Sequence, residues 1–390
     1  MIPYSQLLFL FLLMIVFGMT ACGEETDRPD RVQSGEFIYT GTFSDSEGIN
    51  IFGFDRSGST FSHIGSVMDR TQPNFLAIHP SGNFLYAVSG QRFSDDSNHG
   101  TVSAFKVDRE TGGLELLNER STEGQGPAHV SADPLGRFVY VSNYSGGNVS
   151  VFAVQEDGSL SEVTDTAQHE GSSVNERRQR AAHVHAADPS PDGRFLYVSD
   201  LGIDKIKIYQ VSDSGELTPA ETPYAESEPG AGPRHFTIHP GGEFAYSVEE
   251  LSRTVAVYSV NTQNGALQRL QRLTLLPDDM EGDDSMTAAD IHISPDGNHL
   301  YATTRGPNIL TIFSIDENSG ELSVVGHEST QGGHPRNFMI DQNGEFLLVA
   351  NRDNDNVVMF FRDSESGLLE PAGIELDVPR AVFVTQLILE

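Results

Sequence analysis

Short runs in which apolar and polar residues alternate recur along the chain and predict β-strands. Two such runs, 236–239 and 244–248, flank a Pro-Gly-Gly sequence at 240–242, whose glycines permit the positive φ of a tight turn. They predict an antiparallel hairpin. Because residues equidistant from a hairpin turn lie opposite each other, we expect Arg234 and Glu250, each eight positions from Gly242, to face each other at its open end.

The same order of apolar run, glycine turn and aromatic-rich strand occurs seven times. Strands such as FLYAVSG, FVYVSNY and FAYSVEE follow the turns, and a third strand such as NVSVFAV and a weaker fourth come next in most repeats. The turn glycines, 47 to 57 residues apart, are Gly35, Gly82, Gly136, Gly193, Gly242, Gly297 and Gly344. This period is typical of four-stranded blades. The sequence predicts an all-β fold, a seven-bladed β-propeller of four-stranded antiparallel blades. A pair of β-sandwiches is the alternative, which seven near-equal repeats disfavour.

The first repeat lacks an apolar strand before Gly35, and the run 380–389 at the other end is strand-like but has no repeat of its own. Pairing this run beside 37–42 would complete the first blade and remove two exposed strand edges. We therefore expect one domain, 35–390, closed by pairing of the N- and C-terminal strands.

An apolar run at 2–21 precedes the only cysteine, Cys22. Its most apolar part, 7–18, is short for a membrane span, and the ending Met-Thr-Ala-Cys resembles the lipobox of bacterial lipoproteins, in which the cysteine is acylated after cleavage. We expect a signal peptide with lipobox over 1–22, a tether over 23–34, and an exported protein, periplasmic or on the outer surface, held to the membrane only by a lipid anchor. An ordinary cleaved signal or an uncleaved anchor is the alternative, because no Lys or Arg precedes the apolar run.

The charge balance argues against polyanionic partners. With 24 Lys and Arg against 56 Asp and Glu, the net charge of −32 argues against binding of nucleic acid and against electrostatic docking on anionic lipid. An acidic, lysine-poor composition is also what we expect of a protein that works in concentrated salt. A lone cysteine leaves no partner for an intrachain disulfide.

Polar side chains converge where the first strand of each blade begins and the second ends. The first strand of a propeller blade lines the axis, so these ends open on one face, the mouth. Side chains of this kind are the candidates for binding a ligand or for catalysis. They are His129, His183, His185, Arg234, His235, Glu250, Arg305, Arg336, Asp200 and Asn351.

Structural roles are the alternative for some of these residues. Asp200 and Asn351 stand where a strand enters a turn, where side chains often cap the backbone. Arg234 and Glu250 could form a buried ion pair and do nothing else. Arg305 is expected to lack such a local partner, because Ala289 opposes it.

A metal site is a further alternative. His183 and His185 are alternate residues of one strand, and with His129 and His235 nearby they could hold a divalent metal. Local spacing fixes no third ligand, however. We therefore expect no metal and no cofactor.

Several motifs resemble those of the seven-bladed propeller lactonases, a family that includes bacterial 6-phosphogluconolactonases of the propeller type and a fungal enzyme that lactonises carboxymuconate. The resemblance covers nearly everything after the tether. The motifs are Gly232-Pro233-Arg234-His235, Glu249-Glu250-Leu251, Thr304-Arg305-Gly306 and the runs AHVHAADPSPDGRFLYVSDLG and HPRNFMIDQNGEFLLVANRDNDNVVMF. The resemblance implies an active site of His185 (or His183), Arg234, Glu250 and Arg305. Glu249 and Thr304 stand where the family tends to have Asn, which leaves the substrate open.

The resulting hypothesis is a lactonase that opens a sugar-type lactone by water attack. His185 or Glu250 would accept the proton, and Arg234 and Arg305 would stabilise the oxyanion or hold an acidic substituent. The resemblance implies 6-phosphogluconolactone, whereas export favours a non-phosphorylated lactone. The substrate-binding residues would be His183, His129, His235, Arg336, Asp200 and Asn351.

The alternative is a propeller of the cell envelope that binds a ligand or a protein and catalyses nothing. A binding surface of that kind is expected to carry exposed aromatic or apolar anchors. Only Tyr144 and Phe75 are aromatic among the positions predicted at the mouth, so the sequence favours catalysis.

Overall fold

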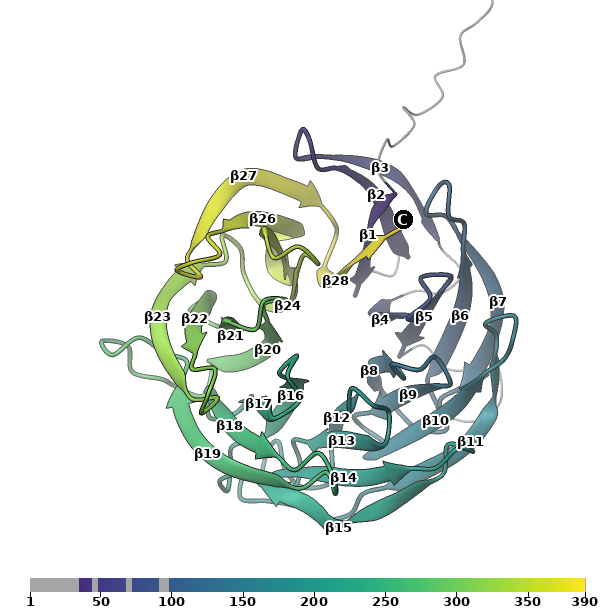
Figure 1. The fold of residues 1–390 in the computed structure, drawn as a ribbon, viewed down its shortest axis with the longest axis vertical. Helices are drawn as coiled ribbons and strands as arrows, with labels where there is room; N and C mark the ends of the chain where they lie inside the picture. Colours follow the sequence, from purple (N-terminus) through teal and green to yellow (C-terminus); the bar gives the residue numbers. More distant parts are fainter. Residues whose placement is uncertain (1–34, 44–47, 68–71, 91–97, 390) are drawn as a thin grey trace, which may run out of the picture. The chain divides into compact units, whose positions relative to one another are not determined.

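The computed structural model describes residues 35–43, 48–67, 72–90 and 98–389. The predicted signal peptide, Cys22 and tether lie outside these ranges. The described residues form 28 strands in seven four-stranded sheets around one axis (Figure 1). The predicted seven-bladed propeller is confirmed. Among these residues, no helix combines the length and the apolar character that a membrane crossing requires.

Each blade contributes one strand to each of four layers, from the axis outwards. The innermost strands are β28 (Ala381–Ile388), β4 (Pro73–Ile78), β8 (Pro127–Ala132), β12 (Val184–Pro189), β16 (Pro233–Ile238), β20 (Thr287–Ile293) and β24 (Pro335–Ile340). The second strands are β1 (Glu36–Thr42), β5 (Phe84–Ser89), β9 (Phe138–Asn143), β13 (Phe195–Asp200), β17 (Phe244–Glu249), β21 (His299–Arg305) and β25 (Phe346–Asn351).

The outer two layers complete the blades. The third strands are β2 (Ile49–Asp55), β6 (Thr101–Val107), β10 (Asn148–Val154), β14 (Lys205–Val211), β18 (Thr254–Val260), β22 (Ile309–Ile315) and β26 (Asn356–Arg362). The outermost strands are β3 (Thr60–Val67), β7 (Leu114–Ser121), β11 (Leu160–Gln168), β15 (Leu217–Glu226), β19 (Leu267–Thr274), β23 (Leu322–Ser329) and β27 (Leu369–Asp377). One 3₁₀ turn, η1 (Arg352–Asn354), follows β25.

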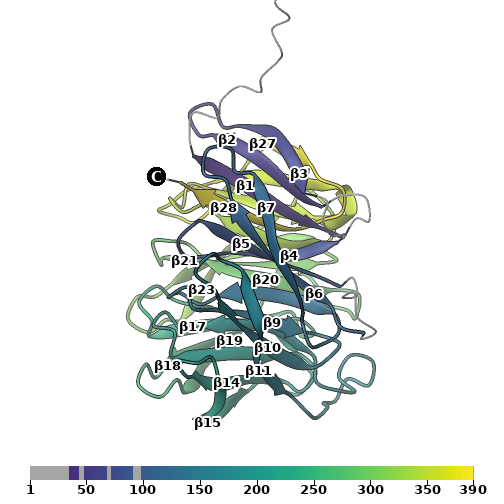
Figure 2. The same cartoon turned by 90° about the vertical axis from the view of Figure 1, so that its right-hand side faces the viewer.

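The ring is closed by the two ends of the domain. Strand β28 pairs antiparallel with β1, so that Phe37 lies opposite Leu387 and Thr40 opposite Val384 (Figures 1 and 2). The backbone N–H of Leu389 donates to the carbonyl of Gly35 at 2.7 Å. The predicted closure is confirmed, and it pairs the inner edge of β1, which would otherwise be open.

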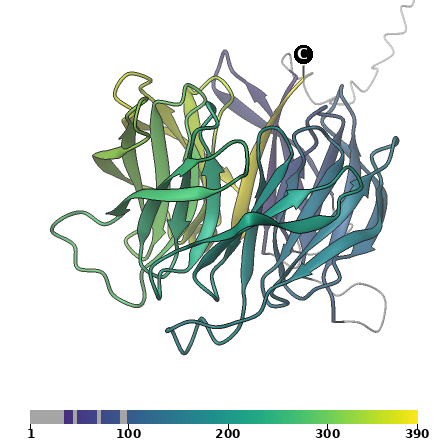
Figure 3. The same cartoon turned by 60° about the horizontal axis from the view of Figure 1, so that its bottom comes forward.

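The hydrophobic core lies between blades. Neighbouring blades stand face to face around the ring (Figure 3). Seven clusters of buried side chains each join two of them; one cluster contains Tyr86 and Val102 of the second blade and Val130 and Phe152 of the third. A tyrosine hydroxyl reinforces several of these joints by donating to a glycine carbonyl of the next blade, as Tyr246 does to Gly320 at 3.0 Å. This repeated packing holds the inner strand ends, and hence the mouth, in fixed positions.

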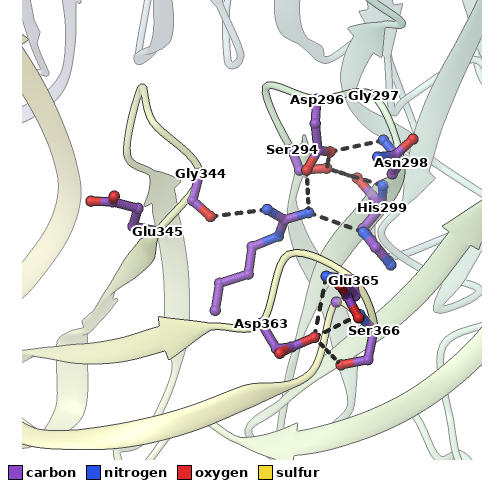
Figure 4. Close-up of polar contacts among 12 residues, drawn as sticks. Ser294, Asp296, Gly297, Asn298, His299, Gly344, Glu345, Asp363, Glu365 and Ser366 are labelled. Atoms are coloured by element: carbon purple, nitrogen blue, oxygen red, sulfur yellow. Dashed lines mark hydrogen bonds and ion pairs between the residues drawn. The ribbon is translucent and has the colours of Figure 1, made fainter.

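The joint between the sixth and seventh blades carries a polar pair in addition to its apolar cluster. His299 stands at the start of β21, where β5, β9, β13 and β17 have Phe, and Arg362 ends β26, where the third strands of the second to sixth blades end in Val or Ile. Arg362 donates to the Tyr301 hydroxyl at 2.9 Å, the Gly344 carbonyl at 2.9 Å and the Asp296 carboxylate at 2.8 Å. Figure 4 shows Asp296, His299 and Gly344 grouped at this joint.

Candidate active site

A pocket of about 510 Å³ opens at the mouth, where innermost strands begin and second strands end. Four of the predicted site residues, His185, Glu250, Arg305 and Arg336, line it. The polar lining as a whole consists of Gln72, Asn74, Tyr144, Arg178, His185, Glu250, Thr287, Arg305, His334 and Arg336.

A β-bulge repeated at the start of the innermost strands gives the mouth its side chains. In β12 the pairing with β13 steps from Val184 to Ala186, so His185 is the extra, unpaired residue. The same step leaves Arg234 unpaired in β16 and Arg336 unpaired in β24. A bulged residue leaves the regular alternation and is re-aimed, which is why bulges are frequent beside active sites. The bulge distinguishes His185 from His183, which precedes the strand and does not line the pocket.

The bulges also shift the predicted registers. Glu249, not Glu250, lies opposite the start of β16, because Pro233 pairs with Glu249 and Arg234 is the bulged residue. The expectation that Ala289 opposes Arg305 is wrong: the step between Ala288 and Ile291 places Thr287 there. The extra residues of both bulges account for these offsets.

Glu250 lies at the centre of the site and is held by three arginines, a group that we call the arginine clasp. Its Oε2 accepts from Arg234 Nε at 3.0 Å and forms an ion pair with Arg305 Nη2 at 3.0 Å, and its Oε1 accepts from Arg178 Nη2 at 2.6 Å. Arg305 therefore does have a carboxylate partner, and the expectation that it stands alone is wrong. It also donates to the Ala288 carbonyl at 2.6 Å.

The arginine clasp fixes the charge of Glu250. Burial alone would raise the pKa of this carboxyl, but the guanidiniums of Arg305, Arg234 and Arg178 outweigh burial and hold the pKa well below its usual range. Burial and the neighbouring Arg305 lower the pKa of Arg234 to about 10, which still leaves it protonated at neutral pH. Glu250 is thus a permanent anion and a weak proton acceptor.

His185 has the opposite character. Its side chain is buried and its Nδ1 has no protein partner. Burial, followed by the charges of Arg234 and of neighbouring histidines, holds the pKa of His185 well below 6.5. The imidazole is neutral at neutral pH, and it therefore has a free nitrogen with which to accept a proton.

Beneath the pocket, His235 supports Arg234. Arg234 Nη1 donates to His235 Nε2 at 3.1 Å, which assigns the ring proton to Nδ1, and Nδ1 lies 2.6 Å from Asp290 Oδ1. Burial, and next Arg234, lower the pKa of His235 to about 4. The other oxygen of Asp290 accepts from Asn337 Nδ2 at 2.6 Å and lies 3.0 Å from His292 Nε2. His235 acts on the pocket through Arg234 and is absent from the lining.

Four pocket residues carry a buried polar atom with no protein partner. These atoms are Asn74 Oδ1, His185 Nδ1, Arg305 Nε and His334 Nε2. Unpaired buried polar atoms are uncommon in folded proteins, and a ligand is one explanation for them. Their convergence on a single pocket marks it as a place where a polar molecule can be bound.

The remaining candidates lie outside the lining. Asp200 is fully buried, and its Oδ1 accepts from the backbone N–H groups of His183 and Gly202 at 2.7 and 2.9 Å. Asn351 is also fully buried and donates to the Thr330 carbonyl at 2.9 Å. The backbone-capping alternative accounts for both positions.

The other two histidines are also engaged with the protein. His183 stacks on Tyr144 with ring centroids 4.5 Å apart, and His129 packs on Phe75 at 4.4 Å. Within the described ranges, no group of three or more His, Cys, Asp or Glu side chains is arranged to hold a metal ion.

Sequence reasoning missed Arg178 and His334. Arg178 lies on the loop 169–183, which has no strand pattern; three arginines within the segment NERRQR of an acidic chain were the available signal. His334 occupies the left-handed region at φ 58, where the equivalent residues before Pro127 and Pro233 are Gly126 and Gly232. A histidine in that conformation is strained, and such strain is frequent at functional sites.

Comparison with known proteins places the chain among enzymes. The profile of the family described as "Lactonase, 7-bladed beta-propeller" matches residues 37–386. The chain is 37% identical to a 6-phosphogluconolactonase of Formosa agariphila and 35% identical to one of Bacillus subtilis, over 87% and 89% of its length and 96% and 97% of theirs. Its fold matches that of the periplasmic gluconolactonase PpgL of Pseudomonas aeruginosa with a TM-score of 0.84 and 31% identity, over 91% of this chain and 99% of that one.

Proposed function

Because the chain belongs to the seven-bladed β-propeller lactonase family, we propose that it hydrolyses a sugar-type lactone in the mouth pocket, with His185 as the base. The observation that carries this assignment is the contrast between two neighbouring groups. Glu250 is a carboxylate neutralised by three arginines, whereas His185 is a neutral imidazole with a free nitrogen. Only the second is suited to remove a proton from water.

The reaction then follows from where the charges lie. His185 takes a proton from water as its oxygen attacks the lactone carbonyl, and negative charge develops on the carbonyl oxygen. Arg305, whose Nε has no protein partner, can donate to this oxyanion. Collapse of the intermediate breaks the ring ester bond, and the proton on His185 passes to the departing ring oxygen. The product is the open hydroxy acid, and the imidazole is neutral again.

The charge of the pocket favours a substrate with an acidic or strongly polar substituent. Arg336 lies over the Phe43 ring at 5.0 Å and, among the described residues, has no carboxylate partner. Burial, then Arg234 and Arg305, hold the pKa of Arg336 well below its ordinary value, so an anion beside it would be favoured. The relatives' names divide between a phosphorylated and a non-phosphorylated lactone, and the pocket is compatible with both.

We also propose that the enzyme is exported. The pattern at 1–22 supports this, as does the similarity to a periplasmic gluconolactonase. Acylation of Cys22 would then hold the propeller at the membrane through 23–34.

A lactone panel tests the proposed function. Gluconolactone, 6-phosphogluconolactone and neutral γ-lactones are supplied to the purified protein, and acid release is followed with and without a chelator. We expect hydrolysis of at least one sugar lactone well above its spontaneous rate and no effect of the chelator. If every lactone is hydrolysed only at its spontaneous rate, the non-catalytic binding alternative is favoured. A loss of activity with the chelator would favour the metal alternative.

A further inference from the structure

Asp204, in the turn between β13 and β14, is a buried carboxylate with four donors, and within the described ranges it forms no ion pair. Its Oδ1 accepts from Gln179 Nε2 and from the Gly232 N–H, both at 2.7 Å. Its Oδ2 accepts from the Gly230 N–H at 2.7 Å and from the Ser173 hydroxyl. The residue is 5% exposed and adopts φ 54.

Part of this arrangement belongs to the repeat. In two other blades the residue at the same turn position, also left-handed, accepts from a backbone N–H just before the next innermost strand. Asn308 Oδ1 accepts from the His334 N–H at 3.0 Å, and Asp355 Oδ1 from the Arg380 N–H at 2.7 Å. The bond from Gly232 to Asp204 is the counterpart of these two bonds.

The bonds from Ser173 and Gln179 are additional to the repeat device. Both come from the loop 169–183, and Gln179 is adjacent to Arg178. Gln179 also donates to the Leu201 carbonyl at 2.8 Å, and its Oε1 accepts from the Asn175 N–H at 3.1 Å. The loop is thus held to the same carboxylate as the turn that leads into Arg234.

These contacts join the two segments at two points, an arrangement that we call the circuit. Arg178 binds one oxygen of Glu250 and Arg234 binds the other, and the segments that carry these arginines both donate to Asp204 Oδ1. Arg178 is the most exposed arginine of the clasp, with 38% of its side chain accessible against 2% for Arg234. Its Nη2 is used by Glu250 and by the Tyr144 hydroxyl at 3.2 Å, and the residue lines the mouth pocket.

We propose that Asp204 is a positioning residue, which sets how Arg178 and Arg234 meet Glu250, and that Arg178 is the arginine it presents to an acidic or polar group of the substrate. The proposal rests on the proposed function, because its main measurement is lactone turnover. Neither residue belongs to the active-site motifs that the family resemblance implied.

Asp204→Asn is the test. The amide keeps the size of the carboxylate, but its NH₂ group replaces one of the two accepting oxygens and faces the donors that bound that oxygen. The contacts on that side are therefore lost and the circuit is loosened. We expect kcat/KM to fall by about 10- to 100-fold, since small displacements of positioned groups cost this much. In an Arg178→Gln background the same change should lower kcat/KM much less, while the fall in Tm is the same in both backgrounds. Asp355→Asn, at the equivalent turn of the seventh blade, is the control and should leave kcat/KM unchanged.

Two outcomes overturn the proposal. The first is a lower Tm with unchanged kcat/KM per folded molecule. The second is a double variant whose loss in kcat/KM equals the product of the losses from Asp204→Asn and Arg178→Gln, because the two residues would then act independently. If Asp204→Asn does not fold, Gln179→Ala releases the loop side alone and carries the same expectation. Hydrogen exchange of amides 173–180 separates this proposal from the proposed function, because it needs no substrate. Faster exchange in Asp204→Asn supports the circuit even if no lactone in the panel is hydrolysed, and unchanged exchange contradicts it.

Discussion

Single side chains decide which group in the mouth can move a proton. Both Glu250 and His185 are candidates from sequence motifs alone, and their surroundings are very different. Three guanidiniums neutralise Glu250, whereas His185 Nδ1 has no protein partner. One of the three, Arg178, comes from a loop with no strand pattern, so the sequence could supply the residue types of the site but not the comparison of their environments.

The pH dependence of turnover tests the role of His185. The pKa of a buried histidine beside Arg234 is depressed, so the neutral, active form persists as pH falls through 6.5. We expect kcat/KM, corrected for spontaneous hydrolysis, to stay level from about pH 7.5 to 6.5 and to decline only at distinctly lower pH. His185→Gln should lose most turnover together with this decline at low pH, the acid limb of the profile, whereas His183→Gln should retain the limb. A limb centred at or above 6.5 would assign the titration to another group.

Arg305→Ala tests the oxyanion assignment. The change removes the unpartnered Nε and one of the three charges that hold Glu250. Since single oxyanion donors are worth about 10²- to 10³-fold in turnover, we expect a loss of that order in kcat. Arg269→Ala, which breaks only the exposed pair with Glu228, is the matched control. Equal kcat/KM in the two variants would remove Arg305 from the site.

At the scale of strands, the alternating pattern predicts where elements run but not where their register slips. The hairpin of β16 and β17 illustrates this, because the aromatic and apolar positions are right and the pairing is one residue off. The bulges fall at the second residue of these inner strands, too close to the strand end for the alternating pattern to locate them. The bulge recurs eight positions before a turn glycine, at His185, Arg234 and Arg336, so these three candidates occupy equivalent positions in their blades.

The polar joint of His299 and Arg362 gives a prediction about blades. Arg362→Val introduces the residue type found in most of the other blades, but it leaves the Gly344 carbonyl and Asp296 Oδ2 without their donor and a gap beside His299. We expect a loss of roughly 2 to 3 kcal/mol in unfolding free energy, as for other broken buried polar contacts. The double variant His299→Phe/Arg362→Val, which restores the apolar pair of the other joints, should recover part of that loss. Additive losses in denaturant unfolding would show that the two residues are not coupled.

For the whole molecule, the period and the unmatched ends were enough to predict the closure of the ring. The run 380–389 had no blade of its own and the first repeat lacked a strand, and β28 fills that place. The number of repeats does not predict which distant segments come together at the mouth. Arg178, Glu250 and His334 come from three different parts of the chain, and no local spacing relates them.

The lipid anchor is a prediction for the intact chain in cells. If Cys22 is acylated, the wild-type protein should sediment with membranes and partition into detergent, and Cys22→Ser should lose both properties while keeping lactone turnover. A wild-type protein that is fully released without detergent would favour the ordinary cleaved signal.

The net charge of −32 predicts how the molecule as a whole responds to salt. Like charges on the surface repel one another and destabilise the compact state, and salt shortens the range of this repulsion to about 3 Å at 1 M. The ion pairs of the arginine clasp are largely buried and are screened less, so the loss of their attraction should be the smaller effect. We therefore expect Tm to rise steadily from dilute buffer to about 1 M NaCl. Glycerol or sucrose should not reproduce the full effect, because neither screens charge. A protein at least as stable and as active in dilute buffer as in molar salt would show that its acidic surface is not an adaptation to salt.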